Sequence, residues 1–145
     1  MADIDLHHFL PVLLDRFTEQ VNRDLDRLCL DRFDLDPIEW RILCYLNLAD
    51  NCSVRDVHHQ LDMEKSKVSR ATDRLEKSGL IDKHTHGSDR RLLRLALTDD
   101  GHDRLSAMIP VLLDFERDLA RRLGLGSAAS LRSTAAQYLQ ESRQK

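Results

Sequence analysis

The sequence contains little glycine, proline or aromatic side chain: its 145 residues include 5 Gly, 3 Pro and only 5% aromatic residues. This composition excludes collagen-like and Pro/Gly-rich linker sequences, and 41% hydrophobic with 32% charged residues is typical of a helical globular protein. No run approaches the roughly 18 apolar residues of a membrane-spanning helix, so we expect no membrane partner. Asp3 and Asp5 occupy the positions where a secretory signal carries positive charge, so we predict no signal peptide.

Cysteine is also scarce, and its pattern points to a reducing compartment. Cys29, Cys44 and Cys52 are odd in number and lack the spacing of metal ligands. We therefore expect reduced thiols and a cytoplasmic protein. The helical pattern around Cys44 predicts a core thiol, whereas Cys52 is expected in an exposed loop. None of the three stands in a pattern that indicates an oxidant sensor.

Positive charge is outweighed overall but concentrated in the middle of the chain. The formal net charge is −3. Residues 53–98 nevertheless hold 10 Lys and Arg against 7 Asp and Glu, a net charge of +3. Residues 1–52 hold 5 against 11, and residues 99–145 hold 7 against 7. A basic centre in an acidic chain indicates a localised surface for an anionic partner such as nucleic acid.

Hydrophobic periodicity predicts a single, mostly helical domain. Apolar residues between positions 6 and 28 recur every three or four residues, which indicates a long first helix. Asp36 is expected to cap a second helix, with Glu39 completing a capping box. Ser53 is expected to cap a short third helix, and a fourth helix is predicted over residues 64–78.

The period changes from helical to alternating after Gly79. Residues 81–86 and 93–97 flank a Gly-containing turn, which predicts a β-hairpin. Two further helices are expected, the first capped by Thr98 and the second over about residues 127–142. The predicted fold class is mainly α with a small β wing, in which a winged helix-turn-helix core is flanked by N- and C-terminal helices.

The predicted fourth helix has two chemically different faces. At about 100° per residue, Val68, Ala71 and Leu75 fall on one side. The opposite side carries Ser66, Lys67, Arg70, Asp73, Arg74 and Lys77. Arginine and lysine can pair with guanine edges or phosphates, so this face suits the major groove of DNA. The alternative is an ordinary amphipathic helix with a solvated face, and the hairpin that follows favours DNA.

The tip of the predicted hairpin carries a second group of charges. It contains Asp89, Arg90 and Arg91. Arginine on a protruding ribbon can enter a narrow minor groove, where the potential is most negative. Asp89 can hold a neighbouring guanidinium by a bidentate contact. The alternative is a polar turn with a surface ion pair, which contributes little.

Several runs of the sequence together resemble the MarR family of bacterial transcription regulators. The runs are residues 40–43, 61–70, 73–81, 89–91 and 95–101. The most specific part is Asp-x-Arg followed by Leu-Thr-x-x-Gly, downstream of Leu-Glu-Lys-x-Gly-Leu-Ile. The resemblance covers essentially the whole chain. It implies a homodimer that binds palindromic double-stranded DNA as a repressor, with release by a small-molecule effector or an oxidant.

The helix face and the resemblance together predict domain boundaries and site residues. Residues 1–145 are expected to form one MarR-like domain, with residues 36–98 as the DNA-binding lobe. Residues 1–35 and 99–145 are expected to be dimerisation helices. The predicted DNA-binding residues are Ser66, Lys67, Ser69, Arg70, Arg74, Lys77, Asp89, Arg90 and Arg91. The resemblance assigns Arg91 as the wing arginine and Asp89 as its partner.

No motif indicates an enzyme, and we expect no cofactor. The sequence lacks His-Glu-x-x-His, a Gly-rich phosphate loop and Gly-x-Ser-x-Gly. His84 and His86 share a strand face, but no further ligands accompany them, so we expect no metal site. The rival hypothesis is a winged helix that binds another protein and no DNA. The basic helix and the wing arginine favour DNA.

Overall fold

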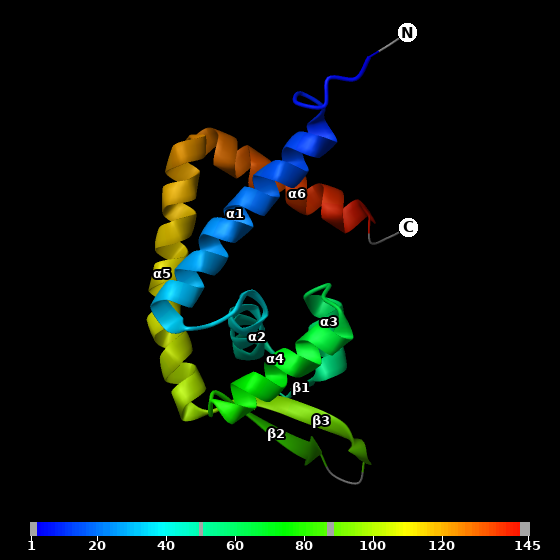
Figure 1. Ribbon diagram of the computed structural model, residues 1–145, viewed down its shortest axis with the longest axis vertical. Helices are drawn as coiled ribbons and strands as arrows, with labels where there is room; N and C mark the ends of the chain where they lie inside the picture. Colours follow the sequence, from blue (N-terminus) through cyan, green and yellow to red (C-terminus); the bar gives the residue numbers. More distant parts are fainter. Residues whose placement is uncertain (1–2, 50, 87–88, 143–145) are drawn as a thin grey trace. The chain divides into compact units, whose positions relative to one another are not determined.

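The computed structural model describes residues 3–49, 51–86 and 89–142, with the side chains of residues 86 and 89–92 outside the described part. The chain forms two compact units, Met1–Met108 and Ile109–Lys145. Its elements are α1 (Leu10–Phe33), α2 (Pro37–Leu48), β1 (Cys52–Ser53), α3 (Val54–Gln60), α4 (Lys65–Lys77), β2 (Ile81–His86), β3 (Asp89–Leu97), α5 (Asp99–Leu123) and α6 (Leu125–Ser142) (Figure 1). The mainly helical fold class with a small antiparallel wing is confirmed. Among the described helices, none combines the length and apolar character needed to cross a membrane.

The helices of the first unit begin where the capping residues predict. Asp36 Oδ1 accepts hydrogen bonds from the backbone N–H groups of Ile38 and Glu39, both at 2.8 Å. Glu39 Oε2 accepts the backbone N–H of Asp36 at 2.9 Å, which completes the predicted capping box of α2. Ser53 caps α3 in the same way, and the Thr98 hydroxyl accepts the Gly101 N–H at the start of α5. These bonds satisfy backbone donors that have no partner inside a helix.

The wing is a three-stranded antiparallel sheet in the order β1-β3-β2. Ile81 pairs with Leu97 and Lys83 with Leu95 in the predicted hairpin. The strand β1 was not predicted, because two residues are too short to show alternation. It pairs Cys52 with Leu95. The expectation that Cys52 lies in an exposed loop is therefore wrong, since β-pairing buries this side chain to 5% exposure.

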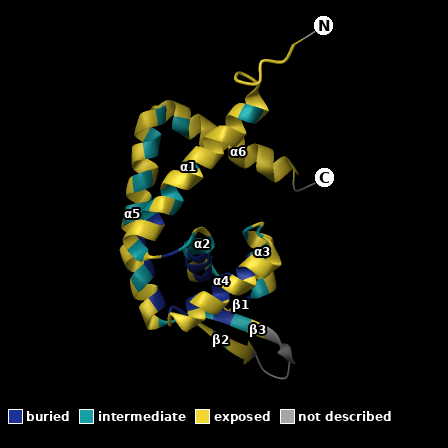
Figure 2. Cartoon of the chain, viewed as in Figure 1, coloured by how far each residue is buried: buried dark blue, intermediate teal, exposed yellow. Residues whose placement is uncertain are grey.

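The core of the first unit lies between α2, α3, α4, the start of α5 and the sheet. The large, fully buried side chains include Ile42, Leu43, Val57, Val68, Leu75, Ile81, Leu95, Leu105 and Met108. Figure 2 shows this burial as dark blue segments of α2 and α4. The apolar side predicted for the fourth helix is confirmed, because Val68, Ala71 and Leu75 are all buried. The opposite side of α4 is left to solvent.

Much of α1 lies outside this core. Cys29, near its C-terminal end, is fully buried, but Leu10, Leu13 and Phe17 are 64%, 41% and 37% exposed. Figure 2 accordingly shows the N-terminal part of α1 largely as exposed residues. The apolar stripe that the sequence predicts on the first helix is therefore present but lacks a full covering within the described residues.

The second unit is a helical hairpin of the C-terminal part of α5 with α6. Leu119, Leu123 and Ala128 are half-buried. An ion pair links the two helices, with Arg132 Nη2 at 2.7 Å from Glu116 Oε1. Leu131 and Tyr138 remain 39% and 70% exposed. Like α1, this unit presents apolar side chains that a single chain does not bury.

Candidate nucleic-acid interface

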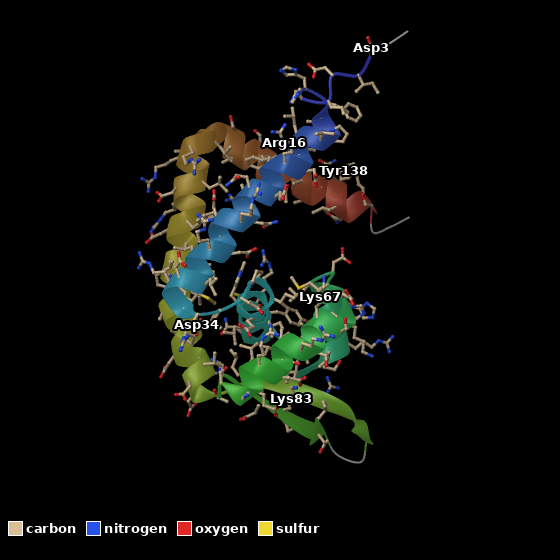
Figure 3. All side chains as sticks on the ribbon, in the orientation of Figure 1. Asp3, Arg16, Asp34, Lys67, Lys83 and Tyr138 are labelled. Carbon is tan, nitrogen blue, oxygen red and sulfur yellow. The ribbon has the colours of Figure 1, made fainter. Side chains whose placement is uncertain are left out.

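The polar side chains predicted to read DNA lie along one exposed face of α4. Ser66, Lys67, Ser69, Arg70 and Lys77 are all exposed on α4, opposite the buried Val68, Ala71 and Leu75. Figure 3 shows Lys67 on this helix, with its side chain outside the core. Lys65, the first residue of α4, is exposed as well. We call Ser66, Lys67, Ser69, Arg70 and Lys77 the α4 face.

The N-terminal end of the α4 face holds a carboxylate. The Ser66 hydroxyl donates to Glu64, and Lys67 Nζ lies 3.7 Å from Glu64 Oε2. The bond from Ser66, followed by the charge of Lys67, lowers the pKa of Glu64. All three side chains are exposed, so the contacts are weak and solvent-screened. An anionic group that approached Ser66 and Lys67 would therefore compete with Glu64 at small cost.

Arg74 differs from the α4 face because it is bound within the protein. Arg74 Nε donates to Glu39 Oε1 at 2.7 Å, and Arg74 Nη2 forms an ion pair with Asp36. Glu39 and Asp36 are the two members of the α2 capping box. The hydrogen bond to Glu39 is the largest cause of a raised pKa at Arg74. Sequence spacing placed Arg74 with the DNA-binding residues, whereas the structure joins it to α2.

Lys83 is also engaged inside the first unit. Its Nζ forms an ion pair with Asp73 of α4 and lies 3.5 Å from Glu76 Oε2, and its side chain is only 10% exposed. Figure 3 labels Lys83 on the wing beside α4. Part of the basic centre found in the sequence therefore stabilises the packing of β2 against α4. Charge counting could not separate this lysine from the solvent-facing ones.

The base of the wing is tied to the chain before α3. Arg94 Nη1 donates to the Asn51 backbone carbonyl at 2.7 Å and lies 3.8 Å from Asp56 Oδ2. His84 Nε2 lies 3.0 Å from Asn51 Oδ1. The sequence contains no local signal for these contacts, because they join positions more than 30 residues apart.

The wing tip is described by its backbone alone. Residues 89–91 belong to β3, which extends the hairpin as predicted. The side chains of Asp89, Arg90 and Arg91 lie outside the described residues. Their predicted roles at the minor groove therefore stay predictions.

The thiols and the histidines form no metal-ligand cluster within the described ranges. There, no group of three or more His, Cys, Asp or Glu residues is arranged to hold a metal ion. Cys29 is fully buried, and this burial, with Asp26 as the next cause, raises its pKa to about 11. Burial also raises the pKa of Cys44 and of Cys52. A thiol acts as a nucleophile through its thiolate, so these environments disfavour reactivity.

Comparison with known proteins shows what this chain is similar to. A model of the MarR family matches residues 33–92. The HTH-type transcriptional regulator BilQ of Clostridioides difficile (strain CD3) is 34% identical over 77 residues, which make up 53% of this chain and 52% of that protein. This match thus spans about half the length of the curated relative.

Solved structures match over nearly the whole chain. The transcriptional repressor CouR, bound to a 23-mer DNA duplex, superposes with a TM-score of 0.85 at 24% identity, covering 95% of this chain and 99% of that one. The regulator BpsR of Bordetella bronchiseptica, whose DNA binding is regulated by 6-hydroxynicotinic acid, superposes with a TM-score of 0.84 at 19% identity, covering 94% of this chain and 97% of that one. These likenesses establish the fold. Residues 33–92 therefore match the MarR family model, and the chain as a whole shares the fold of these solved transcription regulators.

Proposed function

We propose that this protein is a transcription regulator that binds double-stranded DNA and reads its sequence with the α4 face. One observation carries the proposal: α4 buries its apolar side completely and leaves Ser66, Lys67, Arg70 and Lys77 in solvent on the other. A helix of this kind fits the major groove, where arginine and lysine recognise guanine edges. The structural likeness to CouR, which has been solved on DNA, supports it.

The residues of the interface have different proposed roles. Ser66, Lys67 and Arg70 lie in the first half of α4, where base contacts concentrate in helix-turn-helix proteins. Lys77, at the last position of α4, is proposed to contact phosphate. Arg91 is proposed to reach the minor groove, with Asp89 as its orienting partner. Ser69 and Arg90 are proposed to contact the DNA backbone.

We further propose that the protein acts as a homodimer on palindromic DNA. The supporting observation is the exposed apolar stripe of α1, with Leu10, Leu13 and Phe17. Such a stripe is stable in water when a second copy covers it. The helices of residues 1–35 and 99–145 are the proposed dimerisation elements. Two copies of α4 would then lie about one helical turn apart, roughly 34 Å, on the two halves of a palindrome.

Regulation is proposed to come from a small molecule rather than an oxidant. BpsR, which shares the fold, has its DNA binding regulated by 6-hydroxynicotinic acid. The thiols of this chain are poor candidates for oxidant sensing, because Cys29 and Cys52 are buried and have raised pKa values. We therefore propose a ligand-released repressor that works in the cytoplasm, with no catalytic activity.

Salt-dependent binding of duplex DNA tests the proposal. The logarithm of the affinity is expected to fall linearly with the logarithm of salt concentration, by about 0.9 units per neutralised phosphate. A variant with Lys67, Arg70 and Lys77 all changed to Gln should lose most of this dependence. The matched control changes three exposed arginines of the second unit, Arg117, Arg121 and Arg122, to Gln. No binding of duplex DNA would favour a protein–protein module instead, and salt-independent binding or equal loss in both variants would contradict a role of the α4 face.

A further inference from the structure

One guanidinium joins α4 to both members of the α2 capping box. Arg74 donates from Nε to Glu39 Oε1 at 2.7 Å and from Nη2 to Asp36. The Glu39 side chain is only 11% exposed, and its other oxygen accepts the Asp36 backbone N–H. A carboxylate this poorly hydrated is costly unless it is paired. Arg74 therefore has a nearly buried carboxylate as its partner, whereas the partner of Lys67 on the α4 face is the exposed Glu64.

The position of this contact matters for α4 as a whole. Asp36 stands at the N-cap of α2, where the chain enters the winged-helix core from α1. Arg74 lies one turn beyond Arg70 on α4. Apolar packing buries one side of α4 and so sets its rotation coarsely, but the hydrophobic effect contributes no directional bond. A two-pronged guanidinium contact is directional and can refine that rotation.

We propose that Arg74 is a positioning residue: it sets the rotation of α4 through Asp36 and Glu39, so that Arg70 and its neighbours face the major groove, and it does not contact DNA itself. This inference rests on the proposed function. The competing account places Arg74 on a DNA phosphate, as its spacing on the helix suggests. The two accounts predict opposite signs for the loss of the carboxylates.

The decisive variant is Asp36→Asn with Glu39→Gln. Asparagine remains a good N-cap, and glutamine can still accept the backbone N–H of residue 36, so the capping box is retained. Both charges that hold Arg74 are lost. If Arg74 contacted phosphate, its release and the two added charge units would tighten DNA binding. If Arg74 positions α4, the preference for the selected duplex over a scrambled one should fall by about tenfold.

The matched control is Asp62→Asn with Asp82→Asn. Both aspartates are exposed in the same unit, and neither forms an ion pair with the described residues. Asp62 has a φ of 50°, which asparagine tolerates. The control therefore measures the generic electrostatic gain from removing two carboxylates. The positioning account requires the test variant to bind the selected duplex more weakly than this control.

Arg74→Lys is the second variant, because it keeps the positive charge and removes the guanidinium group that contacts two carboxylates at once. One ammonium cannot reproduce the guanidinium geometry between two carboxylates. The positioning account predicts a similar loss of sequence preference with an unchanged salt slope, whereas a phosphate contact predicts near wild-type binding. Thermal unfolding and dimer mass are measured in parallel. If the Asp36/Glu39 variant shows a folding defect, Arg74→Lys alone decides between the two accounts.

The experiment uses the full chain and a duplex selected by the wild type from a random-sequence library. If the wild type selects no duplex, the proposed function fails. If it does select one, but the Asp36/Glu39 variant matches or exceeds the control and Arg74→Lys binds like the wild type, only the positioning role is overturned. A loss of preference in both variants supports it.

Discussion

At the scale of single residues, the charged side chains of α4 divide by what holds them. Arg70 and Lys77 are exposed, whereas Arg74 bridges two carboxylates of α2. A cation without a buried partner can exchange water for DNA at small cost, but Arg74, itself 49% exposed, must first leave the Glu39 carboxylate, which is only 11% exposed. This difference follows from tertiary contacts, so helix-wheel reasoning on the sequence alone could not find it.

Substitutions of Arg70 and Lys77 are predicted to weaken DNA binding in different ways. Arg70→Ala should cost on the order of 1–3 kcal/mol of specific binding and relax the sequence preference at one position of each half-site. Lys77→Ala should weaken all duplexes alike and reduce the salt slope by about one unit. Binding of each variant to the selected duplex and to single-base variants measures both effects. Equal loss of specific and non-specific affinity in Arg70→Ala would contradict a base contact.

Cys29 makes stability depend on pH at the alkaline end. Burial raises the pKa of its thiol from about 9.0 to about 11. The folded state therefore holds the proton more tightly than the unfolded state, so this contribution to stability is complete below about pH 9 and declines toward pH 11. Urea unfolding at about pH 8 and pH 10.5 should show a smaller decline for Cys29→Ala than for the wild type, although the cavity makes the variant less stable at both values. Identical declines would show that Cys29 is not the titrating group.

At the scale of elements, Gly101 explains one part of the sequence signature. It stands in the first turn of α5, where the helix passes directly over the backbone at Leu80. A Cβ on Gly101 would overlap the Leu80 carbonyl oxygen and lie 3.1 Å from the carbonyl carbon and 3.3 Å from Leu97 Cδ2. The glycine thus lets α5 approach the end of α4 and the wing closely. Its requirement is space, not an unusual φ.

Gly101→Ala is therefore predicted to destabilise the protein. The Leu80 backbone cannot move aside as a flexible side chain can. We therefore expect a net loss of about 1–3 kcal/mol in the free energy of unfolding, after the roughly 1 kcal/mol that alanine gains over glycine in a helix. Gly126→Ala is the matched control, because no atom lies within 4 Å of a Cβ there. Denaturant unfolding should show a clear loss for the first and none for the second. Equal stability of the two variants would refute the close approach.

The elements most predictable from sequence were those defined by local chemistry. Asp36, Ser53 and Thr98 cap helices through residues two or three positions away, so short spacing was sufficient to find them. The two faces of α4 likewise follow from helical periodicity. Strand β1 was missed because it has only two residues and its pairing partner lies more than 40 residues downstream. The wrong prediction that Cys52 is exposed followed from missing this strand.

At the scale of the whole molecule, the exposed apolar residues predict assembly. Light scattering should give a mass of about twice 16.8 kDa at micromolar concentration. Leu13→Asp should shift the protein toward monomer, because it puts a charge into the proposed interface. Leu48→Asp, at an apolar residue 84% exposed at the end of α2, is the matched control and should stay dimeric. A monomeric wild type, or equal dissociation of both variants, would contradict the proposed dimer.

The central claim is that two copies of the α4 face read DNA sequence together. Selection of duplexes from a random-sequence library by the wild-type protein, followed by sequencing and by the stoichiometry of the bound complex, tests this claim most directly. We predict an inverted repeat whose half-site centres lie about one helical turn apart, bound by two chains. Enrichment of no sequence, or of a single half-site bound by one chain, would contradict it.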